Sequence, residues 1–184
     1  MKIQLSEPSV KDAIDRLKTL QSNIETANEN IIDTLVSKGE SQANMYNTSA
    51  PNYGFNDTQI ISDKNLNGMK STGSVALTGE QAVYYEFGTG EQGASDGHPW
   101  KWQTDVSLNG YNSGPFVSRH INKKGRHYWI IPKGLYRPSK YVMRNGYTEG
   151  IPAGKQMYST AQYIRFIKDT VITKELNGAI KKFK

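Results

Sequence analysis

The chain has no cysteine, and this absence narrows the chemistry open to it. Without thiols among its 184 residues, it has no disulfide framework, no thiolate nucleophile and no cysteine-based zinc site. It has three histidines, His98, His120 and His127, and none of them has the spacing of a paired metal ligand. We therefore expect no bound metal.

Long hydrophobic runs are also missing. No apolar stretch approaches the roughly 20 residues that a membrane-spanning helix needs, so we expect no contact with a membrane. Residues 1–8 lack the apolar centre of a secretory signal, so we expect no cleaved leader. The formal charge is +6, from 23 basic and 17 acidic residues, which permits a nucleic-acid partner without demanding one.

Hydrophobic periodicity predicts a helix at each end of the chain. Apolar residues recur at steps of three and four over residues 8–39, with Gly39 as the expected stop. The same spacing predicts a C-terminal helix over residues 159–182, capped by Ser159 or Thr160. At this length we expect a single domain over residues 1–184.

Residues 58–150 are expected to supply a sheet and long loops. Asn67-Gly68 is a hairpin signal between two short strand-like runs. Ala82–Phe87 fits a short helix or a turn, and residues 116–121 and 127–131 read as two further strands. The fold class predicted is α+β, an antiparallel β-sheet with a long N-terminal helix and a C-terminal helix packed on it.

A glycine triplet follows the aromatic run near the middle of the chain. Gly88, Gly90 and Gly93 have the literal spacing G-x-G-x-x-G, which binds dinucleotides only where a helix opens directly after it. Here Gly97 and Pro99 stand where that helix should begin, so we expect no nucleotide and no other cofactor. We expect Gly88 and Gly90 to hold positive φ or a close backbone approach.

Glu86 is the one acid embedded among aromatic residues. A buried carboxylate can act as a general acid, but no second carboxylate or nucleophile stands near it in sequence. We expect it to cap backbone amides of the following glycine turn. We therefore predict no catalytic residues and no enzymatic activity.

The chain contains Tyr-Glu-Phe-Gly-Thr-Gly at residues 85–90 and Gly-Lys-Gln-Met at residues 154–157. These two segments resemble the head–tail joining family (neck, or minor tail-component, proteins) of long-tailed bacteriophages. In that family a Tyr/Val-Glu-Phe-Gly-Thr-Gly segment lies between an N-terminal helical region and a C-terminal helix. The second segment is Gly154–Met157 after Pro152-Ala153, where family members more often carry Pro-Phe than Lys-Gln. The residues matching the first are Tyr85, Glu86, Phe87, Gly88, Thr89 and Gly90.

The resemblance implies a structural protein of the virion neck, assembled in the host cytoplasm. Copies would form a ring, of six or twelve, that joins the DNA-filled head to the tail. Its other partners would be a head-closure or adaptor protein and the tail terminator or tail tube, with non-specific contact to genomic DNA. The glycine motif would then have a structural role and take part in the interfaces between subunits.

Two further sets of residues are candidates for binding. Trp100 and Trp102 lie in the long segment 88–114 and fit either an interface anchor or a small core under the loop. Three cations occupy an expected hairpin tip, and they fit either a solvated turn or contacts to phosphate in a nucleic-acid-binding module. They are Lys123, Lys124 and Arg126.

Overall fold

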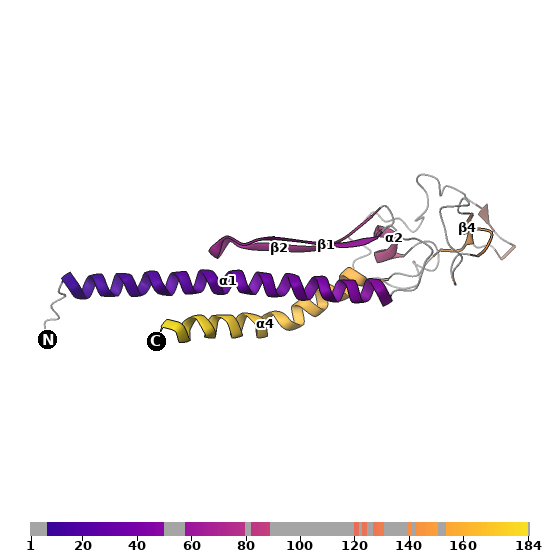
Figure 1. Cartoon of the computed structure of the whole chain (residues 1–184). Coiled ribbons are helices and arrows are strands. Elements are labelled where there is room, and N and C mark those ends of the chain that lie inside the picture. Colours follow the sequence, from indigo (N-terminus) through magenta and orange to yellow (C-terminus); the bar gives the residue numbers. More distant parts are fainter. Residues whose placement is uncertain are drawn as a thin grey trace. The chain divides into compact units, whose positions relative to one another are not determined.

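The computed structural model describes residues 7–49, 58–79, 82–88, 120–121, 123–124, 127–130, 140, 143–150 and 154–183. Two long helices and two small sheets dominate these ranges (Figure 1). The predicted α+β class, with a helix toward each end of the chain and antiparallel strands between them, is confirmed. The helices are α1 (Glu7–Ser49), α2 (Ala82–Phe87) and α4 (Gln156–Phe183).

The strands form two separate sheets. The first is a hairpin of β1 (Gln59–Asn65) and β2 (Thr72–Thr78), joined by the 3-10 turn η1 (Gly68–Lys70). Gly68 has a φ of 50°, which glycine adopts at little cost, so the predicted Asn67-Gly68 turn is confirmed. In the second sheet β4 (His127–Ile130) pairs antiparallel with β3 (His120–Ile121) and with β5 (Tyr147–Thr148).

The contacts divide the chain into two compact units. The first holds residues 1–40, 62–75 and 163–184, and the second holds residues 41–61 and 76–162. The prediction of one domain over residues 1–184 stays a prediction. In the first unit, the β1–β2 hairpin and α4 both pack against α1 (Figure 1). The buried apolar residues of this unit are Ala27, Ile31, Val36, Val171 and Ala179.

The sequence predicts that the N-terminal helix stops at Gly39, but helix α1 continues to Ser49. A Cβ atom on Gly39 would lie 3.2 Å from Cδ1 of Ile164 and 3.3 Å from Cγ2 of Val75. The glycine therefore allows α4 and β2 to approach the C-terminal third of α1 closely. Gly73 of β2 has the same role, because a Cβ there would overlap the side chain of Val36.

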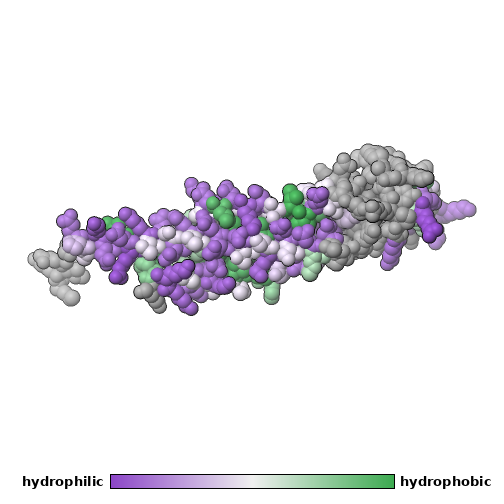
Figure 2. Space-filling view, in the orientation of Figure 1, coloured by the Kyte–Doolittle hydropathy of each residue, from purple (hydrophilic) through white to green (hydrophobic). Residues whose placement is uncertain are grey.

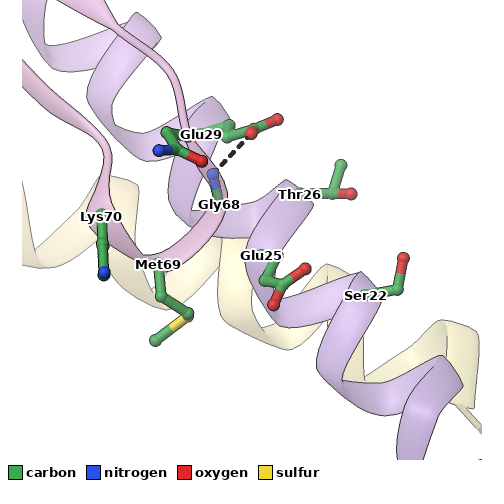
Figure 3. A pocket seen from close by; sticks show the side chains of 8 residues that line it. Ser22, Glu25, Thr26, Glu29, Gly68, Met69 and Lys70 are labelled. Carbon is green, nitrogen blue, oxygen red and sulfur yellow. Dashed lines mark hydrogen bonds between the residues drawn. The ribbon is translucent and has the colours of Figure 1, made fainter.

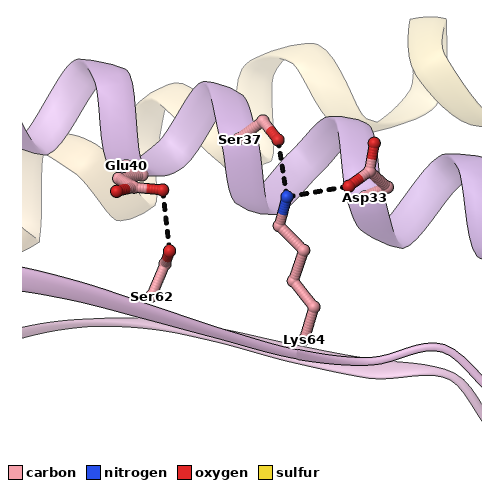
Figure 4. A network of polar contacts seen from close by, with 5 residues as sticks. All are labelled: Asp33, Ser37, Glu40, Ser62 and Lys64. Carbon is pink, nitrogen blue, oxygen red and sulfur yellow. Dashed lines mark hydrogen bonds and ion pairs between the residues drawn. The ribbon is translucent and has the colours of Figure 1, made fainter.

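Polar contacts hold the hairpin on α1 (Figure 4). Lys64 Nζ donates to Asp33 Oδ1 at 2.7 Å and to Ser37 Oγ at 2.8 Å. Ser62 Oγ donates to Glu40 Oε2 at 2.7 Å. Such part-exposed pairs contribute about 0–1 kcal/mol each, so they fix the position of the strand on the helix more than they stabilise it.

Candidate functional site

Helix α2 carries the first of the two segments on which the family resemblance rests. Tyr85 and Glu86 are both buried, at 5% exposure each. The helix ends at Phe87, and Gly88 follows with a φ of 70°, the left-handed conformation that commonly ends a helix. The positive φ predicted for Gly88 is confirmed, whereas Gly90 lies outside the described residues.

The end of α2 binds the chain just before α4. The amide of Gly154 donates to the carbonyl of Tyr85 at 2.7 Å, and the amide of Lys155 donates to the carbonyl of Glu86 at 3.2 Å. Carbonyls in the last turn of a helix have no intrahelical donor, so these two bonds satisfy groups that would otherwise be unpaired. The two segments of the resemblance are therefore hydrogen-bonded to each other.

The Glu86 carboxylate caps the N-terminus of α4. Its Oε2 accepts from the amide of Met157 at 2.8 Å, and its Oε1 accepts from the amide of Tyr158 at 2.8 Å. Both are first-turn amides of α4, where a negative charge is also favoured by the helix dipole. We call this set of contacts the Glu86 clasp; its members are Tyr85, Glu86, Gly154, Lys155, Met157 and Tyr158.

The clasp bears on two sequence predictions. Glu86 caps backbone amides, and two of them belong to α4. The glycine turn beyond Gly88 lies outside the described residues, so the cap predicted there stays a prediction. Neither Ser159 nor Thr160 caps α4, because the helix already begins at Gln156 and both residues lie inside it. Thr160 Oγ1 instead donates to the carbonyl of Gln156 at 2.8 Å. A remote glutamate thus replaces the local cap that the sequence pattern indicates.

Gly154 and Gln156 are packed tightly in the clasp. A Cβ atom on Gly154 would lie 2.5 Å from Gln156 Oε1 and 2.6 Å from the carbonyl oxygen of Tyr85. Gln156 itself is 1% exposed, and within the described part of the chain neither polar atom of its side chain has a hydrogen-bond partner. A buried amide without partners costs about 1–3 kcal/mol, which makes Gln156 the weak point of this site.

We expect Gln156→Met to raise the free energy of unfolding by about 1–2 kcal/mol, because methionine has a similar volume and no polar group to desolvate. Urea denaturation followed by circular dichroism measures the change. The exposed Gln162→Met on the same helix is the matched control and should stay within about 0.5 kcal/mol of the parent. A loss of stability in Gln156→Met would mean that a buried water satisfies the amide.

A polar pocket lies in the first unit, between α1 and the turn of the hairpin (Figure 3). Its volume is about 430 Å³. Glu29 Oε1 accepts from the amide of Gly68 at 2.8 Å, and Glu25 Oε1 accepts from Gln21 Nε2 at 2.8 Å. Glu29 therefore binds the turn of the hairpin, and Glu25 binds a neighbouring side chain on α1. The lining residues are Ser22, Glu25, Thr26, Glu29, Asn67, Gly68, Met69 and Lys70.

The other candidate residues are only partly described. Lys123 and Lys124 are exposed in the turn between β3 and β4, as the predicted basic tip requires. Thr89, Gly90, Trp100, Trp102 and Arg126 lie outside the described residues, so the roles predicted for them stay predictions. The sequence reasoning missed the contact of Glu86 with residues 154–158, although the second segment of the resemblance marked their place.

The described ranges contain no group of three or more histidine, aspartate or glutamate side chains arranged to hold a metal ion. None of the described helices combines the length and hydrophobicity needed to cross a membrane. In the clasp, both carboxylate oxygens of Glu86 are engaged by backbone amides, so its geometry is that of a structural cap. Comparison of the chain with protein-family models, curated proteins and solved structures found no match.

Proposed function

We propose that the chain is a structural subunit of the neck of a long-tailed bacteriophage. One observation carries the proposal: the two segments that resemble this family, separated by more than 60 residues, are the two that the Glu86 clasp joins. A motif that holds the fold together explains why glutamate and glycine are needed there. It does so without a catalytic step.

The proposed mechanism is assembly. Copies of the chain form a ring, of six or twelve, between the DNA-filled head and the tail, with contacts that run head to tail around the ring. One face of the ring binds a head-closure or adaptor protein, and the other binds the tail terminator or tail tube. The protein acts in the virion neck after assembly in the host cytoplasm, and it needs no cofactor.

A phage that lacks this protein should produce filled heads and complete tails that do not join. Electron microscopy of the lysate measures the fraction of joined particles, and supplying the protein in trans should restore it. The purified protein should also form rings, alone or on isolated tails, in negative-stain images. Joined, infectious particles in its absence would contradict the proposal.

A second candidate function, from a different class, is nucleic-acid binding through the basic tip. The exposure of Lys123 and Lys124 favours it. A binder that neutralises several phosphates loses affinity steeply as salt rises, because counterions are released. We expect only weak, salt-sensitive DNA binding, abolished by Lys123→Glu with Lys124→Glu and without loss of assembly. Tight binding at physiological salt would support the second candidate instead.

A further inference from the structure

Two energetically unfavourable features lie next to each other where the chain enters α4. Lys155 has a φ of 58°, and it is the only non-glycine residue with a positive φ in the described part of the chain. An L side chain is strained in this left-handed conformation, which persists only where the surrounding contacts impose it. Gln156 is 1% exposed, and among the described residues neither polar atom of its side chain has a partner.

The Glu86 clasp imposes both features. The amide of Lys155 donates to the carbonyl of Glu86 at 3.2 Å, and its carbonyl accepts from the amide of Ser159 at 2.8 Å, so bonds on both sides fix its backbone. The side chain of Gln156 lies over Gly154, because a Cβ on that glycine would lie 2.5 Å from Oε1 and 2.6 Å from Nε2. Opening of the clasp lets Lys155 return to a negative φ and lets water reach the Gln156 amide. The closed clasp therefore stores strain that its opening releases.

Helix α4 is held in place by contacts that do not involve the clasp. From residue 163 onward it belongs to the first unit, in which Val171 and Ala179 are buried and Ile164 lies close to Gly39 of α1. The surface of the helices visible in Figure 2 is mainly hydrophilic with separate hydrophobic patches, as expected of helices that bury one side and expose the other. The buried side of α4 can therefore keep the helix folded when its first turn is released.

The clasp also joins the two ends of the segment 87–153. Tyr85 and Glu86 come before this segment, and the residues that they bind come after it. We propose that Gly154–Gln156 is a strained latch: the clasp opens and recloses while the long helices stay folded, and each opening separates the two ends of the segment. This inference goes beyond the proposed function, because it describes the isolated chain.

Amide hydrogen exchange of the purified full chain tests whether this opening exists. The amide of Gly154 is bonded to a carbonyl and that of Tyr158 to the Glu86 carboxylate, so the two report on different bonds of one clasp. We expect both to show the same protection and to exchange at least about tenfold faster than the amide of Val171 in the middle of α4, because local opening costs less than global unfolding. Low concentrations of urea should barely change their rates, because a local opening exposes little surface.

A first pair of variants tests whether the strain at Lys155 sets the open population. Lys155→Gly and Lys155→Ala remove the same charged side chain, but only glycine relieves the positive φ. Exchange at Gly154 and Tyr158 should be about fivefold slower in Lys155→Gly than in Lys155→Ala. Neither substitution changes the intrinsic exchange rates of these two amides, because such rates depend on the residue itself and on the one before it.

A second pair of variants tests the contribution of the buried amide. Gln156→Met keeps the volume of the side chain and removes the polar group that lacks a partner in the closed clasp. It should slow exchange at Gly154 and Tyr158 by about fivefold. The exposed Gln162→Met on the same helix is the control and should change both rates by less than about twofold. Faster exchange in Gln156→Met would mean that the amide is satisfied in the closed clasp, and would contradict the inference.

The remaining outcomes are equally decisive. If Gly154 and Tyr158 exchange no faster than Val171, the clasp opens only when the whole chain unfolds, and the latch is ruled out. Equal exchange in Lys155→Gly and Lys155→Ala would show that the positive φ stores no strain. A change at one amide without the other would show two independent contacts in place of one latch. None of these results depends on ring formation or on head–tail joining, so the neck proposal is left to its own tests.

Discussion

Glu86→Ala should lower the free energy of unfolding by about 3 kcal/mol or more. The substitution removes a buried carboxylate that accepts from two amides, each at 2.8 Å, and leaves both donors of α4 without a partner. Charge-assisted hydrogen bonds contribute about 1.5–3 kcal/mol each, and the helix dipole adds about 0.3–1 kcal/mol. Chemical denaturation measures the total loss.

Amide hydrogen exchange separates this mechanism from a general loss of packing. In Glu86→Ala, exchange should increase first at Met157 and Tyr158, whose amides the carboxylate binds. Glu86→Gln should also destabilise the protein, because the NH₂ group of the glutamine, a donor, would face one of the two amide donors of α4. Glu29→Ala is the matched control: it removes one half-buried bond, to the amide of Gly68, and should cost about 1 kcal/mol. Equal losses in Glu86→Ala and Glu29→Ala would contradict the clasp.

Gly154→Ala adds one methyl group inside the clasp. It should lower the free energy of unfolding by about 2–4 kcal/mol. The new Cβ would lie 2.6 Å from the carbonyl oxygen of Tyr85, and that oxygen already accepts from the Gly154 amide, so the backbone has no room to retreat. Thermal unfolding and denaturant titration both measure the effect.

Two further variants make the Gly154 experiment specific. Gly178→Ala adds the same methyl to α4 where nothing lies within 4 Å. It should stabilise the protein by up to about 1 kcal/mol, because alanine favours helix. Adding Gln156→Ala to Gly154→Ala removes the overlap with the glutamine side chain but not the one with Tyr85, so stability should recover only in part. Complete recovery would show that the Tyr85 carbonyl can move aside.

Local patterns predicted the local elements of this fold. Asn67-Gly68 marked the hairpin because a tight turn needs positive φ at a defined place, and the structure has it there. The pattern of Ala82–Phe87 predicts a short helix or a turn, and the segment is helix α2. Both assignments depend on residues next to one another in the chain, where propensity and turn chemistry act directly.

Contacts between distant residues could not be predicted in the same way. Glycine often ends a helix, so the sequence alone marks Gly39 as a stop. In the structure Gly39 allows close packing against Ile164 and Val75, which lie far away in sequence. Capping rules are local and predict Ser159 or Thr160 as the cap of α4, whereas the capping carboxylate comes from Glu86. The resemblance marked both segments of the clasp without indicating that they bind each other.

The order of synthesis gives the clasp a further consequence. Glu86 precedes the amides it binds by 71 and 72 residues, so a ribosome must complete the start of α4 before the carboxylate can find them. Closing a loop of that length costs about 4 kcal/mol of chain entropy, which the nascent chain has to recover in one late event. A growing chain paused before Met157 should therefore be sensitive to proteases in its middle third, and release of the finished chain should be the step that ends that sensitivity.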